Sequence, residues 1–164
     1  MASGSRVLPW RRHQAATSHE LAPLLAAYKR RHPKGSVSPI NRAYDMSREA
    51  HRHQTRTTGE SYITHPVAVA SVVADIGLDE ASIIAALLHD AVEDTELTLA
   101  EIAEIFGDEV ASIVDGVTKL DRLQFDSQEA QQAATMRKML VAMARDLRVL
   151  IIKLAARLHN MRTL

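Results

Sequence analysis

The apolar residues of this chain recur every three or four positions, a spacing that places them on one face of an α-helix. No segment shows the strict alternation of apolar and polar residues that indicates a half-buried β-strand. The pattern therefore predicts an all-α fold, with a flexible leader over residues 1–17 and a single helical domain over 18–164. The predicted helices cover about 18–31, 38–54, 66–76, 80–90, 99–106, 108–120, a long helix around 136–143, and 147–164.

Residues that favour helix ends stand at several of these boundaries. Ser18 and Asp79 precede apolar periodic segments and are predicted to cap them, and Thr98 with Glu101 forms a capping-box pattern. Gly77 predicts the end of the third helix, because glycine readily adopts the left-handed backbone conformation that closes a helix.

The apolar spacing also predicts which face of a helix turns toward the core. In the third helix the predicted inner face consists of Val69, Val72, Val73 and Ile76. In the last helix the predicted buried residues are Leu150, Leu154 and Leu158.

The amino-acid composition argues against several classes of protein. The 20 Lys and Arg residues balance the 20 Asp and Glu residues, so the chain has no net charge to attract nucleic acid or an anionic membrane. A length of 164 residues suffices for one hydrophobic core. The chain contains no cysteine for disulfides or thiolate metal sites, and no apolar run long enough to span a membrane. We expect a cytoplasmic protein that would bind any anionic ligand through a local cluster of cations.

The segment LLHDAVED, residues 87–94, places an imidazole and three carboxylates at the end of an apolar helix. At helical spacing His89 stacks on Glu93 and Asp90 stacks on Asp94, so the four side chains can point to a common site. Three acids near a helix C-terminus oppose the helix dipole unless a cation is bound, which favours a divalent metal site. In the alternative, the helix ends at His89 or Asp90 and the acids form a solvated loop.

His65 is the second candidate for a metal ligand, because it stands at a predicted irregular corner before Pro66 with polar neighbours such as Tyr62. The alternative is a structural histidine held by hydrogen bonds. Imidazole and carboxylate ligands without a thiolate suit Mn²⁺ or another first-row divalent ion. The other histidines, His53 and His159 included, show no grouping with acids and are interpreted as surface or packing residues.

An anionic substrate would need cations, and four are candidates. Arg56 precedes a flexible TTG turn, while Lys153, Arg157 and Arg162 lie along the last helix. Alternatively, these cations are solvated positions on amphipathic segments. The chain lacks P-loop, HExxH, GxSxG and CxxC motifs, which leaves a P-loop NTPase, a zincin and a serine hydrolase without support.

Four segments in unbroken order, SYITHP, LLHDAVEDT, DGVTKLDR and IIKLAARLHNMRTL, resemble the hydrolase domain of the RelA/SpoT family of guanosine tetra- and pentaphosphate synthetases and hydrolases. The resemblance extends from about residue 39 to residue 164. It implies an HD-domain helical bundle, truncated at its C-terminus, of the HD superfamily of metal-dependent phosphohydrolases. It also implies Mn²⁺-dependent removal of the 3′-pyrophosphate from ppGpp or pppGpp, which yields GDP or GTP in stringent-response alarmone turnover.

The resemblance assigns roles to individual positions. One Mn²⁺ would be bound by His65, His89 and Asp90, and Glu93 with Asp94 would position or activate the attacking water. The resemblance places Arg56, Asn160 and Thr163 at the nucleotide. The further predicted contacts are Thr57, Thr58, Lys153 and Arg157. This domain would have guanosine tetra- or pentaphosphate as its partner, and neither nucleic acid nor a membrane.

The chain departs from the family pattern at important positions. Ala156 stands where the KLADRLHN motif of the family has a metal-binding Asp, and a methyl group cannot coordinate a metal ion. Thr57 and Ser61 replace a basic residue and a proline that are common in the substrate loop. The synthetase and regulatory domains are missing, so we expect a fragment or a reduced relative. These departures predict impaired hydrolysis.

Two other hypotheses stay open. A non-catalytic module that binds guanosine nucleotides, or regulates through them, is favoured by Ala156 and opposed by the retained Glu93 and Asp94. A truncated helical scaffold without a ligand is the third possibility.

Overall fold

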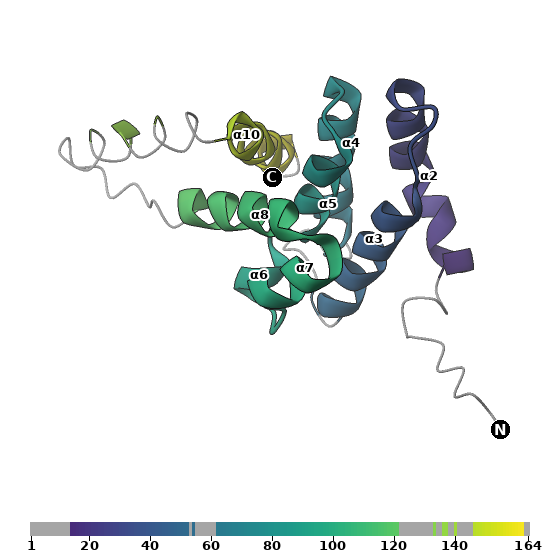
Figure 1. The fold of residues 1–164 in the computed structure, drawn as a ribbon, viewed down its shortest axis with the longest axis horizontal. Helices are drawn as coiled ribbons and strands as arrows, with labels where there is room; N and C mark the ends of the chain where they lie inside the picture. Colours follow the sequence, from purple (N-terminus) through teal and green to yellow (C-terminus); the bar gives the residue numbers. More distant parts are fainter. Residues whose placement is uncertain are drawn as a thin grey trace.

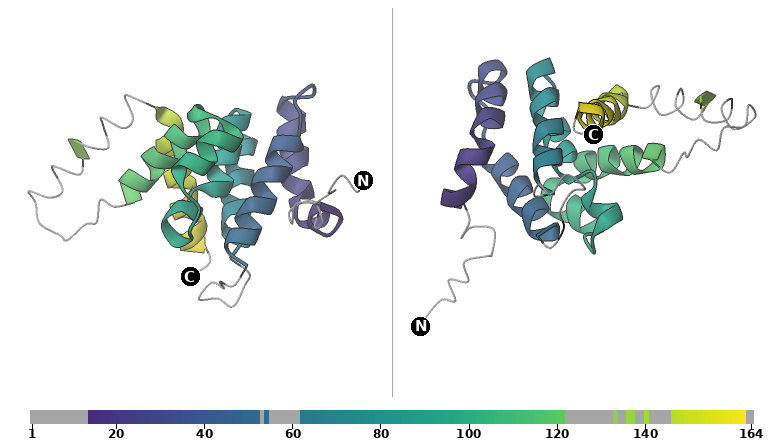
Figure 2. Two further views of the ribbon diagram at one scale, coloured as in Figure 1. Left: turned by 60° about the horizontal axis from the view of Figure 1, so that its bottom comes forward. Right: turned by 180° about the vertical axis from the view of Figure 1, so that it is seen from behind.

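The computed structural model describes residues 14–52, 54, 62–121, 133, 136, 137, 140 and 146–162 of the chain. The helices are α2 (Gln14–Arg31), α3 (Ser38–Ala50), α4 (Thr64–Ile76), α5 (Glu80–Leu88), α6 (Ala91–Asp94), α7 (Leu99–Phe106), α8 (Asp108–Asp121) and α10 (Leu147–Arg162). No strand occurs among the described residues, which confirms the predicted all-α fold. α4 and α5 lie in the middle, with α2 and α3 on one side and α8 and α10 on the other (Figure 1). The further views show α10 beside α4 and α8, both of which it contacts (Figure 2).

Helix α5 is the centre of the core and contacts α3, α4, α8 and α10. Every residue from Ser82 to Leu88 is buried, as expected for a helix that is apolar on all sides. Burying a side chain such as Ile83 or Leu88 contributes about 1.5–3 kcal/mol to stability. The side chain of Asp79 caps the helix as predicted, by accepting a hydrogen bond of 3.1 Å from the Ser82 backbone N–H. This buried helix carries the next residue in the sequence, His89, into the interior.

Helix α4 begins at Thr64, two residues before the predicted start at Pro66. Proline fits the first turn because the N–H groups of that turn have no helical acceptor. His65 is therefore on a helix and buried, and the prediction of an irregular corner at this residue is wrong. Gly77 closes α4 with a φ of 99°, as predicted.

The outer boundaries differ from the sequence pattern by a few residues. Helix α2 begins at Gln14, before the predicted cap Ser18, so residues 14–17 of the predicted leader are helical. Helix α3 ends at Ala50, short of the predicted Gln54. The rest of the leader, and most of the long helix predicted around 136–143, lie outside the described residues. None of the described helices is both long and apolar enough to cross a membrane.

The buried face of α10 is not the predicted one. Its buried residues are Val149, Ile152, Ala155 and Ala156. Leu154 and Leu158 are instead 56% and 40% exposed, and Leu150 is only half-buried. The prediction was wrong because α10 carries two apolar stripes, and the stripe that contains Ala155 and Ala156 is the buried one in a helix that packs against α4 and α8.

A smaller correction applies to α4. Val69 and Val73 are buried as predicted, but Val72 is half-buried and Ile76 is 54% exposed. Ala70 and Ala74 are buried in their place. Helix α4 is covered by α2, α5 and α10, so its small residues also face neighbouring helices.

Candidate metal centre

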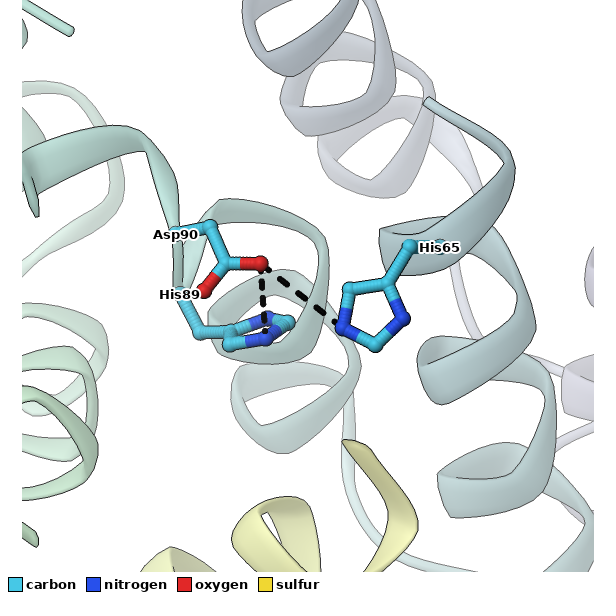
Figure 3. A group of neighbouring side chains, drawn as sticks. All are labelled: His65, His89 and Asp90. Atoms are coloured by element: carbon cyan, nitrogen blue, oxygen red, sulfur yellow. Dashed lines mark ion pairs between the residues drawn. The ribbon is translucent and has the colours of Figure 1, made fainter. Parts of the chain in front are cut away.

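Three side chains from separate parts of the chain meet at the C-terminal end of α5. His65 comes from the first turn of α4, and His89 and Asp90 form the junction between α5 and α6. Asp90 Oδ2 lies 3.3 Å from His89 Nε2 and 3.7 Å from His65 Nε2 (Figure 3). One ligand atom from each residue lies within 4.8 Å of the other two. The structure thus brings together the three residues predicted as metal ligands.

The hydrogen bond of His89 fixes which of its ring nitrogens is available to a metal ion. Its Nδ1 lies 2.6 Å from the carbonyl oxygen of Ala86, an atom that can only accept a hydrogen bond. Nδ1 therefore carries a proton, and Nε2 faces Asp90, where it can take either a second proton or a metal ion. Histidine ligands of metal ions commonly have this orientation, with the second nitrogen donating to a backbone carbonyl.

The donor atoms of this cluster fit a divalent cation. His89 Nε2 and Asp90 Oδ2 face each other across 3.3 Å, and both are acceptors when Nε2 carries no proton. Two acceptors at this distance repel each other unless a cation, either a proton or a metal ion, lies beside them. The set contains nitrogen and carboxylate oxygen and no sulfur, which suits Mn²⁺ and other first-row divalent ions.

His65 has a further contact that the sequence did not reveal. Its Nδ1 lies 2.7 Å from Nδ1 of His159, which is on α10. We interpreted His159 from the sequence as a surface or packing residue, because no acid lies near it along the chain. The available signal was its position three residues after Ala156, which places both residues on the same side of α10.

Helix α10 contributes no carboxylate to the centre. Ala156 is 7% exposed and lies on the buried face of α10, where its methyl group packs in the core. In the described part of the chain, His65, His89 and Asp90 are the one group of three potential ligands that converge in this way.

The acidic turn after Asp90 differs from both predictions made for it. Glu93 and Asp94 lie on α6, a single turn, and the Asp94 amide donates a hydrogen bond of 3.0 Å to the Asp90 carbonyl. Both side chains are exposed and neither joins the ligand group, so the predicted convergence of three carboxylates is wrong. The alternative is confirmed in part, because α5 ends with His89 as its C-cap and both acids are exposed, but these acids lie on a helical turn and not in a loop. The helix breaks after Leu88, and this break separates the two acids from the buried cluster.

Tyr62 connects the acidic turn to the cluster. Its hydroxyl donates a hydrogen bond of 2.7 Å to Asp94 Oδ2 and lies 3.5 Å from Asp90 Oδ2. Its ring stacks on His51, with centroids 4.3 Å apart. Burial, followed by the negative charge of Asp90 and the hydrogen bond to Asp94, raises the pKa of Tyr62, so the hydroxyl stays protonated and able to donate. From the sequence, Tyr62 was predicted only to be a polar neighbour of His65.

The predicted nucleotide-binding residues are placed only in part. Lys153 is half-buried on α10, and Arg157 and Asn160 are exposed on the same helix. Their spacing of four and three residues puts them along one side of α10. The predicted contacts Arg56, Thr57, Thr58 and Thr163 lie outside the described residues.

The chain matches the model of the HD domain family over residues 43–164. It is 51% identical over 151 residues to a "Probable GTP pyrophosphokinase" of Mycobacterium leprae, covering 92% of this chain and 19% of that protein. It is 50% identical over 132 residues to the "Bifunctional (p)ppGpp synthase/hydrolase SpoT" of Escherichia coli K12, covering 80% of this chain and 19% of that protein. It is 56% identical over 119 residues to the "Guanosine-3′,5′-bis(diphosphate) 3′-pyrophosphohydrolase" of Haemophilus influenzae, covering 73% of this chain and 18% of that protein. The chain therefore spans less than a fifth of the length of these relatives.

Proposed function

This chain belongs to the HD domain family, and we propose that it is a metal-dependent hydrolase domain that acts on guanosine 3′,5′-bis(diphosphate) and its pentaphosphate form. The reaction would remove the 3′-pyrophosphate and leave GDP or GTP. The observation that carries the proposal is the convergence of His65, His89 and Asp90 within 4.8 Å. The substrate is proposed because the relatives whose names refer to (p)ppGpp synthesis or hydrolysis are 50% and 56% identical to this chain over the aligned residues.

The proposed ion is Mn²⁺, held by His65, His89 and Asp90. When bound, the ion would polarise a phosphoryl oxygen of the 3′-diphosphate as a Lewis acid. The burial of both histidines supports this assignment, because buried rings cannot rotate away from the positions that a metal ion requires.

Glu93 and Asp94 are the proposed catalytic residues for the attacking water. They lie on the turn that directly follows Asp90, and their exposed carboxylates are accessible to water and substrate. One carboxylate would accept a proton as the water oxygen bonds to phosphorus and the bond to the 3′-oxygen breaks. The 3′-oxygen takes up a proton, and pyrophosphate leaves. Tyr62 would hold Asp94 in place through its hydrogen bond of 2.7 Å.

Cations would bind the polyphosphate groups of the substrate. Lys153 and Arg157 lie on one side of α10, the helix that also contacts His65 through His159. We propose that these two cations, together with Asn160, contact the nucleotide. Arg56 is proposed to stack on the guanine.

Ala156 is the reason to expect weak activity. A centre with two imidazoles and one carboxylate keeps fewer ligands and less negative charge than one with a second carboxylate. Changes outside the ligand shell already cost 10–100-fold in metal affinity or activity, so loss of a ligand should cost at least about as much. We therefore propose that hydrolysis in this chain is impaired.

A second candidate function is a nucleotide-binding module without catalysis. The observation in its favour is Ala156, which is buried on the face of α10 where the family motif has a ligand. Calorimetry with ppGpp in the presence of EDTA would test it. Tight binding without metal favours this module, and absence of binding under these conditions excludes it.

The test of hydrolysis is pyrophosphate release from ppGpp with Mn²⁺, measured for the native chain, Ala156→Asp and Ala156→Asp combined with Asp90→Asn. We expect slow release by the native chain, a gain of at least about tenfold for Ala156→Asp, and loss of that gain in the double variant. If Ala156→Asp binds Mn²⁺ and still releases no pyrophosphate, the proposed catalytic function is wrong.

A further inference from the structure

The contact between His65 and His159 ties α10 to the metal centre although Ala156 supplies no ligand. The two Nδ1 atoms are 2.7 Å apart, and the ring centroids lie 5.0 Å apart. His159 is half-buried, and Ala155 and Ala156 anchor its helix in the core. A histidine pair at this distance needs one proton between the two nitrogens, so one ring donates and the other accepts.

The position of His159 does not suit a direct ligand. The converging ligand atoms belong to His65, His89 and Asp90, and His159 is not in that group. His159 meets Nδ1 of His65, whereas Nε2 on the far side of the same ring faces Asp90. Figure 3 shows the two ring nitrogens of His65 on opposite sides of the ring, so His159 contacts the side of His65 that is turned away from Asp90.

The direction of the hydrogen bond decides whether His65 can bind a metal ion. If His159 donated, the proton of the neutral His65 ring would sit on Nε2 and point at the ligand cluster. If His65 donates, the proton of the neutral ring is on Nδ1 and Nε2 carries the lone pair that a metal ion requires. Asp90 Oδ2 is 3.7 Å from Nε2, too far to hold a proton there by a hydrogen bond.

From this geometry we infer that His159 is a positioning residue: it accepts a hydrogen bond from His65 Nδ1 and so holds the His65 ring with Nε2 directed at His89 and Asp90. The Ala86 carbonyl has the same role for His89, because it accepts a hydrogen bond from Nδ1 and leaves Nε2 facing the centre. The two ligand histidines are then both fixed with Nε2 facing the centre, one by its own helix and the other by α10. This inference rests on the proposed metal centre, but it makes a claim about His65 that is measurable without metal.

The experiment compares His159→Asn with His159→Leu. Asparagine places its side-chain oxygen near the position of histidine Nδ1 and accepts a hydrogen bond, whereas leucine has a similar shape and no acceptor. His32→Leu is the matched control, because His32 also hydrogen-bonds at 3.3 Å, but to the Leu78 carbonyl. Circular dichroism during heating checks that each variant folds.

The first measurement is the tautomer of His65, from ¹⁵N chemical shifts of the ring in the metal-free protein, with the signals assigned by their loss in His65→Asn. We expect the proton on Nδ1 in the native chain and in His159→Asn, and a mixture of tautomers in His159→Leu. An unchanged tautomer in a folded His159→Leu variant overturns the inference. Equal mixtures in His159→Asn and His159→Leu overturn it as well.

The second measurement is Co²⁺ affinity from calorimetry, together with the visible absorption spectrum of the complex. We expect His159→Leu to lose about 10–100-fold in affinity, and His159→Asn and His32→Leu to stay within about threefold of the native value. Equal losses in His159→Asn and His159→Leu, with a changed spectrum in both, would make His159 a ligand and overturn the positioning role. If the native chain binds no Co²⁺ at all, the proposed metal centre fails, while the tautomer measurement still decides the role of His159.

Discussion

The hydroxyl of Tyr62 donates a hydrogen bond of 2.7 Å to Asp94 and lies 3.5 Å from Asp90, so one side chain contacts both a proposed catalytic carboxylate and a proposed metal ligand. The stack of its ring on His51 and its burial keep the hydroxyl in this place. Tyr62 thereby links the exposed turn of α6 to the buried cluster.

Tyr62→Phe should reduce turnover and leave the fold nearly intact. The variant keeps the ring that stacks on His51 and loses only the donor to Asp94. Because Asp94 is exposed, water replaces most of the lost interaction, and the free energy of unfolding should fall by less than about 1 kcal/mol. In the Ala156→Asp background we expect kcat for ppGpp to fall about tenfold with little change in Mn²⁺ affinity. An unchanged kcat would contradict a positioning role for Tyr62.

Asp90→Asn should weaken metal binding. Mn²⁺ affinity should fall at least about tenfold, because a neutral amide replaces the carboxylate. Calorimetry with Mn²⁺ measures this loss, and urea unfolding in EDTA checks that the metal-free variant is folded.

A matched control for this prediction is Asp94→Asn, which changes an exposed carboxylate outside the ligand group. We expect a much smaller effect on Mn²⁺ affinity in that variant. An unchanged Mn²⁺ affinity in Asp90→Asn would contradict the proposed role of Asp90 as a ligand.

The three residues that converge were predictable from the sequence, whereas the residues that contact them were not. His65, His89 and Asp90 belong to contiguous motifs, SYITHP and LLHDAVED, so their residue types and order were visible along the chain. The contact between His159 and His65 joins residues 94 positions apart and depends on how α10 packs against α4. Periodicity could not show this packing.

The inner face of α10 shows why. The large side chains of Leu154 and Leu158 were predicted to form the buried face of α10. In the structure, the buried face contains the smaller residues Ala155 and Ala156 instead. Helix position and type follow from local pattern, but the choice between two apolar stripes depends on the shape of the neighbouring helices. The same limit applies to His65, which the pre-proline rule placed at a corner and the structure places in a helical turn.

The ion pairs of Arg148, in the first turn of α10, should make the free energy of unfolding depend on pH. It contacts Asp79, Glu109 and Asp146 at 2.8–3.0 Å, which joins the first turn of α10 to the N-terminal ends of α5 and α8. The hydrogen bond from Arg148 lowers the pKa of Asp146. Burial acts to raise the pKa of Asp79, but hydrogen bonds from Ser82 and the charge of Arg148 outweigh it, so this pKa is also lowered.

A lowered folded-state pKa means that each carboxylate stabilises the fold above its unfolded pKa and loses this contribution as the pH falls through the folded value. Arg148→Met should therefore lower the free energy of unfolding by about 1–2 kcal/mol at pH 7, since the network is partly exposed. The difference from the native chain should begin to shrink as the pH falls below about 4, the usual pKa of aspartate, and disappear below the lowered folded-state pKa values of Asp79 and Asp146. Urea titrations between pH 2.5 and 7 would measure it. A constant difference over this range would contradict the assignment.

Gly116→Ala should weaken the packing of α10 and, through it, the metal centre. A Cβ at Gly116 would lie 2.7 Å from Cγ2 of Val149 in the buried first turns of α10, so either that side chain or the whole helix must move. Overpacking of this kind costs about 1–3 kcal/mol, while replacing glycine within a helix returns up to about 1 kcal/mol. The expected net loss is about 1–2 kcal/mol in urea unfolding, accompanied by weaker Co²⁺ binding if α10 shifts and carries His159 away from His65.

Val149→Ala supplies the control, because in combination with Gly116→Ala it removes the atom that clashes. The double variant should be more stable than the sum of the two single losses predicts. Additive losses would show that α8 and α10 already have room for the methyl group.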